Sequence, residues 1–206
     1  INIETGNVDV SKLNEKLLIA KKKNKLPKII IPVHFSGQPT DQLEIWKLSK
    51  KYGFKIIEDA SHSLGARHRQ ELVGSCKWSD ITVFSFHPVK MITSAEGGAA
   101  LTNDIKIYDR LKKFSSHGIN KKKTNMEFVP KGDWYYEQQL LGFNYRLSDL
   151  HAALGISQLS KLNKFVLQRN KIAKRYDKDL NKRFITIPYI NGNNLSSFHL
   201  YAIRID

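Results

Sequence analysis

Two short apolar segments, Lys28–Val33 and Phe54–Glu58, flank a stretch whose hydrophobic residues recur with helical spacing and which ends near Gly53. Short β-branched runs on either side of an amphipathic helix predict a βαβ unit. The two strands of such a unit are parallel, and we expect them to be buried on both faces. This pattern limits the chain to an α/β architecture.

Later segments extend the same architecture. Asp80–Phe86 and Gly98–Thr102 are predicted to be strands, and Ile105–Phe114 is predicted to be a helix with one apolar side. The polar stretch from Lys121 to about Tyr136 is typical of a loop. The fold class is therefore α/β with a mostly parallel sheet.

From Ser148, a favourable N-cap residue, helical periodicity runs as far as Tyr176, and we expect a kink near Gly155 or Asn163. Ile185–Ile190 and Leu200–Ile205 then predict strands of a second, smaller α+β unit. The 206 residues begin without a methionine and end inside the last predicted strand. We therefore expect a chain that is truncated at both ends.

Composition excludes several classes of protein. The 34 Lys and Arg residues outnumber the 19 Asp and Glu residues, which gives a net charge of +15 and favours an anionic partner. A single cysteine, Cys76, excludes an internal disulfide and Cys-rich zinc modules. No metal site is expected. The low cysteine content fits a reducing compartment, so a cytoplasmic location is the default. No apolar stretch approaches the roughly 18 to 20 residues that span a bilayer.

The chemistry is expected where predicted parallel strands end, because ligands of such sheets bind at the carboxyl ends of the strands. Asp59 and His62 follow one strand, and Ser85 and Lys90 follow another. A desolvated lysine can attack a carbonyl, a carboxylate can keep a heterocyclic nitrogen protonated, and hydroxyl groups can bind a phosphate. These are the demands of pyridoxal phosphate chemistry, although spacing alone favours a surface lysine for Lys90 and a turn or cap residue for Asp59.

Five ordered motifs carry a resemblance that covers nearly the whole chain. They are EDASHSLGA (58–66), SFHPVK followed by TSAEGGAALTND (85–104), SHGI (116–119), GFNYRLSDLHAALGISQL (142–159) and HLYAIRI (199–205). In this order they resemble the DegT/StrS family of sugar-nucleotide aminotransferases. The resemblance implies the large domain of a fold-type I pyridoxal-phosphate transferase over residues 1–160. It implies an inter-domain helix and the start of a small domain over residues 161–206.

The resemblance also implies a role for each matching residue around the cofactor ring. Lys90 matches the lysine that forms the Schiff base with pyridoxal 5'-phosphate and moves a proton between substrate carbons. Asp59 matches the partner of the pyridine nitrogen, and His62 matches the position that bonds the ring oxygen O3′. Ser61 matches the small residue against the face of the ring.

At the phosphate end, Ser85 matches a phosphate ligand, and Asn144 matches an asparagine that reaches the phosphate of the neighbouring subunit. The resemblance therefore implies a homodimer with shared active sites. Arg146 and His117 fall in family motifs, where dimer contacts and substrate contacts are equally compatible with them. His87 is expected to be a packing residue.

Within the family, the run Val33–Pro39 and the closing SSFHLY look most like the members that aminate a UDP-linked 4-keto-6-deoxy-N-acetylhexosamine in pseudaminic acid biosynthesis. Glutamate is the amino donor that the family implies. Perosamine synthases and other 4-amino-sugar aminotransferases are the near alternatives. Family members are about twice this length and carry a further phosphate-binding segment, so the 206 residues alone are expected to have little activity.

Two unrelated functions compete with this interpretation. A basic nucleic-acid-binding domain would explain the charge, but the lysines are spread along the chain and form no recognition motif. A hydrolase could use Ser85, His62 and Asp59, yet no G-x-S-x-G turn surrounds Ser85. We therefore expect neither a nucleic-acid partner nor a membrane partner.

Overall fold

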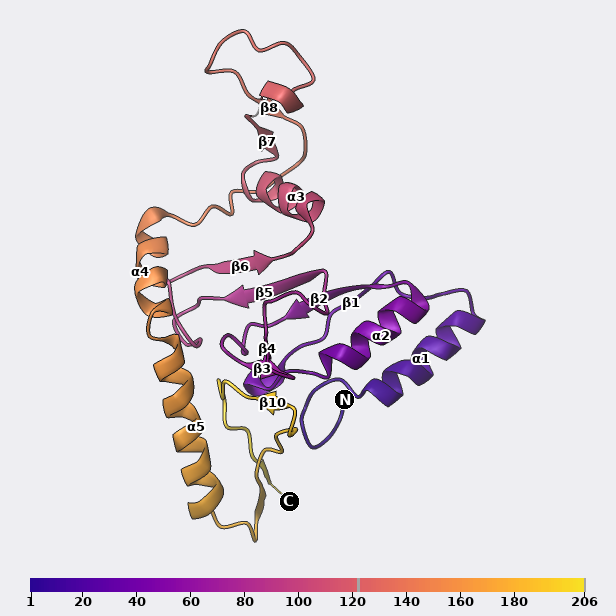
Figure 1. The fold of residues 1–206 in the computed structure, drawn as a ribbon, viewed down its shortest axis with the longest axis vertical. Helices are drawn as coiled ribbons and strands as arrows, with labels where there is room; N and C mark the ends of the chain where they lie inside the picture. The colour runs from indigo at the N-terminus through magenta and orange to yellow at the C-terminus, as the bar shows by residue number, and fades with distance from the viewer. Residues whose placement is uncertain (122, 206) are drawn as a thin grey trace. The chain divides into compact units, whose positions relative to one another are not determined.

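The computed structural model describes residues 1–121 and 123–205 (Figure 1). The chain divides into two compact units, and each is described by itself. Unit 1 consists of Ile1–Thr102 together with the chain from Leu150 onwards, and unit 2 consists of Asn103–Asp149.

Three of the helices begin at an aspartate whose side chain accepts a hydrogen bond from the first turn, which is a favourable N-cap. Helix α2 ends at Gly53, whose left-handed backbone (φ 78°) is a common helix stop. Helix α1 was not predicted from the sequence. The α-helices are α1 (Val10–Lys22), α2 (Gln42–Tyr52), α3 (Ile105–Ser115), α4 (Asp149–Leu159) and α5 (Leu162–Asp179), and the 3₁₀ helices are η1 (Phe35–Gly37) and η2 (Lys123–Asn125).

The central sheet has the order β1-β2-β5-β6, in which β1, β2 and β5 are parallel and β6 is antiparallel to β5. The mostly parallel α/β sheet predicted from the sequence is thereby confirmed. The strands are β1 (Ile29–Ile30), β2 (Lys55–Asp59), β3 (Arg67–His68), β4 (Glu71–Leu72), β5 (Ile81–Ser85), β6 (Gly98–Leu101), β7 (Ile119–Asn120), β8 (Glu137–Gln138), β9 (Ile185–Thr186), β10 (Asn194–Leu195) and β11 (Arg204–Ile205).

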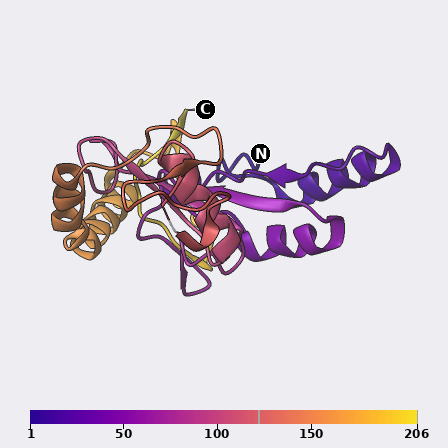
Figure 2. The ribbon, with the colours of Figure 1, turned by 90° about the horizontal axis from the view of Figure 1, so that it is seen from above.

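One face of the sheet is covered far better than the other. Buried side chains alternate along β2 and β5, and Ile56 on β2 packs with Leu17 of α1 and Ile45 of α2. On the opposite face Val83 keeps 36% of its surface exposed, and Val33 keeps 45%. The expectation of burial on both faces was therefore wrong for this structure, because α1 and α2 lie together on one side of unit 1 (Figures 1 and 2).

The long helix predicted from Ser148 is interrupted, as expected, close to Asn163. Helix α4 ends at Leu159 and α5 begins at Leu162. Both helices lie on the side of unit 1 away from α1 and α2, and the carboxyl ends of β2 and β5 point toward them (Figure 1). Among the described residues, no helix is long and apolar enough to cross a membrane.

The last two predicted strands are shorter than expected. Ile185–Thr186 pairs with Arg204–Ile205, while residues 187–190 and 200–203 lie outside strands. Pro188 has no N–H to donate to a ladder, and the N–H of Leu200 donates instead to the carbonyl of Ser36. Strand β10 pairs with β3, which joins this segment to the main body of unit 1.

Unit 2 contains α3 and the antiparallel pair β7 and β8. Its remaining chain is irregular over most of the stretch that the sequence predicted to be a loop. A domain boundary at residue 160 follows from the resemblance alone and stays a prediction.

Two glycines with nearly the same backbone allow a test of how α5 packs on unit 1. A Cβ added at Gly53 (φ 78°) would meet open space, whereas a Cβ at Gly65 (φ 83°) would lie 2.8 Å from Cγ2 of Val166 on α5. We expect Gly53→Ala to lower the free energy of unfolding by about 1 kcal/mol, because the left-handed backbone disfavours a Cβ. Gly65→Ala should cost at least about 1 kcal/mol more, because α5 must move.

Urea unfolding of both variants, made in the protein expressed from its complete coding sequence, measures the difference. Equal losses for the two variants would contradict the close packing of α5 on the loop after β2.

Candidate active site

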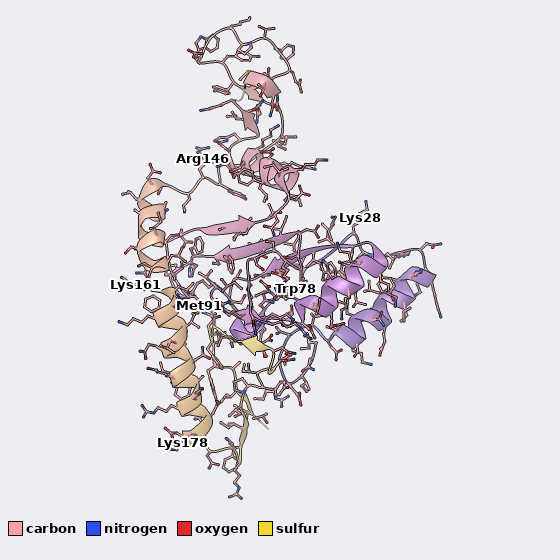
Figure 3. The ribbon with its side chains drawn as sticks, viewed as in Figure 1. Lys28, Trp78, Met91, Arg146, Lys161 and Lys178 are labelled. Carbon is pink, nitrogen blue, oxygen red and sulfur yellow. The ribbon has the colours of Figure 1, made fainter. Side chains whose placement is uncertain are left out.

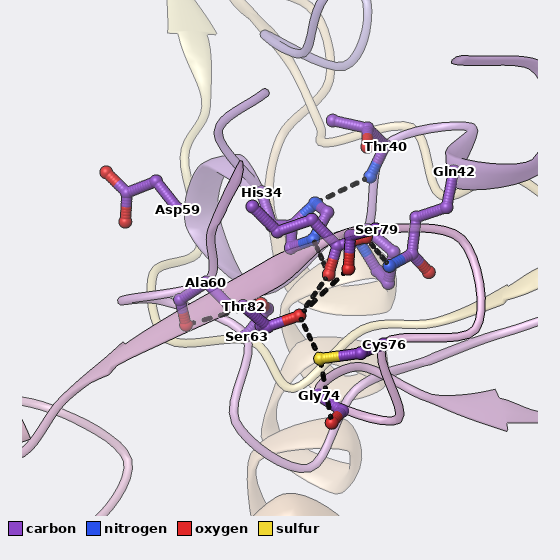
Figure 4. Close-up of polar contacts among 12 residues, drawn as sticks. His34, Thr40, Gln42, Asp59, Ala60, Ser63, Gly74, Cys76, Ser79 and Thr82 are labelled. Atoms are coloured by element: carbon purple, nitrogen blue, oxygen red, sulfur yellow. Dashed lines mark hydrogen bonds and ion pairs between the residues drawn. The ribbon is translucent and has the colours of Figure 1, made fainter. Parts of the chain in front are cut away.

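Strand β2 ends in two adjacent carboxylates that point to opposite faces of the sheet. Glu58 is 1% exposed and belongs to the buried face, whereas Asp59 is half-buried. Figure 4 shows the Asp59 carboxylate turned away from the polar network around His34 and Thr82. The alternation of side chains along a strand accounts for this separation, because neighbouring residues point to opposite faces.

Glu58 is the centre of a buried hydrogen-bond network. Its carboxylate accepts hydrogen bonds from Nε2 of Gln42 on α2 and, at 2.8 Å, from Oγ1 of Thr82 on β5. Nε2 of His34 lies 3.7 Å from Oε2 of Glu58, and Nδ1 of His34 accepts the Thr40 N–H. Burial by itself raises the pKa of Glu58, but His34, Gln42 and Thr82 together outweigh it and hold the pKa below the usual range.

Asp59 is fixed by its backbone and by one of its two carboxylate oxygens. Its N–H donates to the carbonyl of Pro32, and its own carbonyl accepts the N–H of His34, so that it is tied to the chain after β1. Oδ1 accepts hydrogen bonds from the N–H of Ser61 at 3.1 Å and from Oγ of Ser61 at 2.6 Å. Within the described residues Oδ2 accepts no hydrogen bond, so it is available to a ligand.

Lys90 lies in a loop that leaves the end of β5 and returns to β6. The N–H of Phe86 donates to the carbonyl of Gly97, and the carbonyl of Phe86 accepts the N–H of Ser94, so the base of the loop is closed. Met91, which follows the lysine, is 3% exposed and anchors the loop on the side of the sheet next to α5 (Figure 3).

A groove of about 530 Å³ is lined by this loop and by helices α4 and α5. Its lining includes Lys90, Met91, Phe165 and Arg169. Lys90 is half-buried, and its amine makes no hydrogen bond or ion pair with any described residue. The amine is therefore free to react with a ligand.

His62 shares this environment with Lys90 and Asp59. Burial lowers the pKa of His62, the positive charge of Lys90 lowers it further, and the charge of Asp59 partly opposes both effects. Nδ1 of His62 is buried and has no hydrogen-bond partner among the described residues. The structure thus brings together the three residues that the sequence placed after two different strands.

The two serines take different positions around this cluster. Ser61 is occupied with Asp59, as described above. Ser85 is half-buried and shares the face of the sheet that carries Val83 and Asp59, because Val83 pairs with Asp59 and Ser85 is two residues further along β5. Oγ of Ser85 accepts the N–H of His87 at 3.4 Å, which leaves its own proton for a ligand.

Asn144 belongs to unit 2, where it forms a β-bridge with Ser116. The N–H of His117 donates to the carbonyl of Phe143, and Arg146 lines a hollow within the same unit. The predicted role of Asn144 at the phosphate stays a prediction. His87, which was expected to pack, is exposed, because the turn at Pro88 carries it outward near Glu96.

Sequence reasoning missed one residue of the cluster. The ring of His199 lies against that of His62, with a centroid distance of 4.4 Å and a tilt of 38°. His199 is in the HLYAIRI motif, which supplied a signal but no role.

The residues around Lys90 fit the cofactor that the family resemblance implies. Lys90 offers a free amine, Asp59 offers an unused carboxylate oxygen for a protonated ring nitrogen, and Nδ1 of His62 is a buried polar atom without a partner among the described residues. No donor set for a metal competes with this interpretation, since the described residues contain no group of three or more His, Cys, Asp or Glu side chains that could hold a metal ion.

Comparison with known proteins gives a consistent result. The model of the DegT/DnrJ/EryC1/StrS aminotransferase family matches residues 1–206. A UDP-4-amino-4,6-dideoxy-N-acetyl-beta-L-altrosamine transaminase of Campylobacter jejuni subsp. jejuni serotype O:2 is 43% identical over 202 residues, which are 97% of this chain and 50% of that protein. The chain spans about half the length of the curated relatives that it matches.

Solved structures agree with the family match. Helicobacter pylori PseC, an aminotransferase involved in the biosynthesis of pseudoaminic acid, matches with a TM-score of 0.84 and 33% identity over 98% of this chain and 50% of its own. The putative sugar aminotransferase Spr1654 from Streptococcus pneumoniae, in its PMP form, matches with a TM-score of 0.83 and 26% identity over 100% of this chain and 55% of its own.

The Glu58 network predicts a pH-dependent loss of stability in Glu58→Gln. At pH 7 the amide places donor hydrogens against the donors of Gln42 and Thr82, and we expect a loss of about 1 to 3 kcal/mol in the free energy of unfolding. The pKa of Glu58 lies below its usual value of about 4.5 in the folded protein. The stability that the ionised group contributes is therefore present above pH 4.5 and is lost as the pH falls through the folded pKa.

The difference between the wild-type protein and Glu58→Gln should accordingly narrow below pH 4.5. Urea unfolding from pH 7 to pH 3.5 measures it. Glu15→Gln, which removes a surface carboxylate paired with Lys12, serves as the control and should change stability by less than about 0.5 kcal/mol. A difference that does not vary with pH would mean that folding leaves the pKa of Glu58 unchanged, and would contradict the network.

Proposed function

The chain belongs to the DegT/DnrJ/EryC1/StrS aminotransferase family, and we propose that the protein catalyses pyridoxal-phosphate-dependent transamination of a UDP-linked 4-keto-6-deoxy-N-acetylhexosamine. Glutamate is the proposed amino donor, and the product serves the biosynthesis of pseudaminic acid or a related surface glycan. The observation that carries the proposal is the cluster of Lys90, Asp59 and His62 at the carboxyl ends of β2 and β5. The 43% identity to a transaminase of this substrate class supports the choice of sugar.

Pyridoxal phosphate, when bound, supplies an aldehyde that links to an amine and a ring that withdraws electrons from that link. Lys90 holds the cofactor through its Nζ atom. As a free amine, the same Nζ atom would carry a proton between the reacting carbons. The closed loop from Phe86 to Ser94 limits the movement of this amine and would help to orient it toward a bound ligand.

Asp59 holds the proton on the ring nitrogen through Oδ2. Ser61 donates twice to Oδ1 and so fixes the direction of the carboxylate. Ser61 would lie beside the face of the ring, and Ser85 would donate its hydroxyl proton to the phosphate. His62 would bind the ring oxygen O3′, and its lowered pKa favours an uncharged imidazole at neutral pH beside Lys90.

The proposed assembly is a cytoplasmic homodimer in which Asn144 binds the phosphate in the site of the neighbouring subunit. The family motif GFNYR, from Gly142 to Arg146, supports this assignment. Exposed aromatic rings in the same segment also support it, because Phe143 is 54% exposed and Tyr145 is 73% exposed. Apolar rings with this much free surface are typical of residues that a partner covers.

The central experiment is to trap the cofactor on Lys90. The protein from the complete coding sequence is mixed with pyridoxal phosphate and reduced with borohydride, and the labelled peptide is identified by mass spectrometry. We expect the adduct on Lys90 and, with a UDP-4-keto sugar and glutamate, turnover that falls by at least about 10³-fold in Lys90→Ala. Lys28→Ala removes an exposed lysine of unit 1 and should retain both signals. An adduct on another lysine would overturn the assignment.

Mixing two inactive variants tests the shared site. In a dimer of Lys90→Ala with Asn144→Ala, one of the two sites receives both intact residues. At a cofactor concentration where neither variant alone is active, mixed protomers should therefore recover up to about a quarter of the wild-type rate. Co-purification of differently tagged chains shows that protomers exchange. Exchange without recovery would place Asn144 in the site of its own subunit.

A further inference from the structure

His199 lies next to the proposed cofactor site, and neither the motifs nor the proposed mechanism gives it a role. Its ring is tilted by 38° against the ring of His62, with centroids 4.4 Å apart. Nδ1 of each ring is buried and has no hydrogen-bond partner among the described residues. The two imidazoles therefore contact each other through their faces and leave these nitrogens unused.

The backbone that carries His199 is fixed to the loop that carries His62. Oγ of Ser197 donates to the carbonyl of His62 at 2.9 Å, and the N–H of Ser197 donates to the carbonyl of Gly37 at 3.0 Å. Ser197 is 0% exposed, so water does not compete for these hydrogen bonds.

Helix α5 holds the same backbone from the other side. Nη1 of Arg169 donates to the carbonyl of Phe198 at 3.0 Å and to that of His199 at 3.1 Å. Phe198 has a positive φ of 48°, an unfavourable conformation for a residue with a Cβ, which the surrounding hydrogen bonds maintain. The backbone at His199 is thus held by contacts from three separate segments.

We propose that His199 is a positioning residue, whose ring packs on His62 and fixes that imidazole beside Lys90. The inference rests on the proposed function and deepens it. A histidine side chain that packs on one face against a fixed ring has fewer accessible rotamers. The ring nitrogens of His62 therefore keep one orientation. A binding site requires such a fixed orientation of the residues that contact its ligand.

The charges around His199 favour the uncharged form of the ring. Burial lowers the pKa of His199 to about 4, and repulsion from His62 when that ring is protonated, from Lys90 and from Arg169 contributes in that order. These groups come from the loop after β2, the loop after β5 and α5. Among the described residues, Asp59 is the only carboxylate that acts on the pair, and it acts on His62. His199 therefore adds a ring to the site without adding a cation beside Lys90.

Two substitutions distinguish the contribution of the aromatic ring of His199 from that of its ring nitrogens. His199→Phe keeps an aromatic face on His62, whereas His199→Gln fills similar space with a polar chain that cannot pack in the same way. Leu195→Ala, at an exposed position on β10 four residues earlier, is the matched control. All variants are made in the protein from the complete coding sequence.

The first readout needs no cofactor. NMR titration of ¹³C-labelled histidine gives the pKa of His62, which lies below 6.5 in the wild-type protein. We expect it to stay low in His199→Phe and in Leu195→Ala, because His62 remains covered. In His199→Gln it should rise toward 6.5, because water reaches the ring that His199 had covered.

The second readout is kinetic. We expect kcat to fall about tenfold in His199→Gln and less than threefold in His199→Phe, because orientation and not a proton transfer is lost. An unchanged His62 titration in His199→Gln would overturn the proposal. Equal losses in both variants would also overturn it, since they would assign the effect to the nitrogens.

The borohydride reaction separates this inference from the proposed function. An adduct on Lys90 with no response of His62 to His199→Gln refutes the positioning role alone. An adduct elsewhere refutes the proposed function, while the titration still reports whether the two rings are coupled.

Discussion

The buried carboxylate of Glu58 is the interaction on which the arrangement of the site depends. It connects α2 through Gln42, β5 through Thr82 and the chain after β1 through His34. Removing a partner from such a network leaves a buried charge or donor unpaired, which costs more than the net gain of one hydrogen bond. The orientation of β2 is therefore fixed, and with it the direction of Asp59 on the opposite face.

The sequence predicted the elements whose hydrophobic pattern is strong and local. The expected bounds of β2, β5, β6 and α3, and the expected end of α2 near Gly53, agree with the structure to within about two residues, because each has a clear hydrophobic period. Helix α1 escaped notice because its apolar stripe is narrow, and only Leu17 within it is fully buried. The strands after Thr186 were predicted to be too long. The backbone there forms hydrogen bonds with distant segments, such as that of the Leu200 N–H with the Ser36 carbonyl, and these contacts depend on tertiary structure.

The candidate site divides in the same way. Asp59, His62 and Lys90 could be predicted because each follows a strand end, and the family motifs then suggested their roles. The alternation along β2 contained the signal that Glu58 faces the core with Ile56, yet two adjacent acids look equivalent until the buried face is known. The contact of His199 with His62 could not be predicted, because it joins residues that are far apart in the chain and depends on how Ser197 and Arg169 hold the backbone.

Unused bonding capacity separates the functional residues from the structural ones more clearly than residue type does. Glu58 accepts hydrogen bonds at both oxygens and has little left to offer a ligand, whereas Asp59 uses only Oδ1 within the described residues. Lys90 is half-buried, unlike most of the described lysines, and its amine has neither an ion pair nor a hydrogen bond with a described residue. Both oxygens of Glu58 are engaged inside the buried network, whereas Oδ2 of Asp59 and the amine of Lys90, which lie at neighbouring strand ends, have no hydrogen-bond partner among the described residues. Cofactor and substrate can then supply the missing partners without disturbing the hydrogen bonds that hold the sheet together.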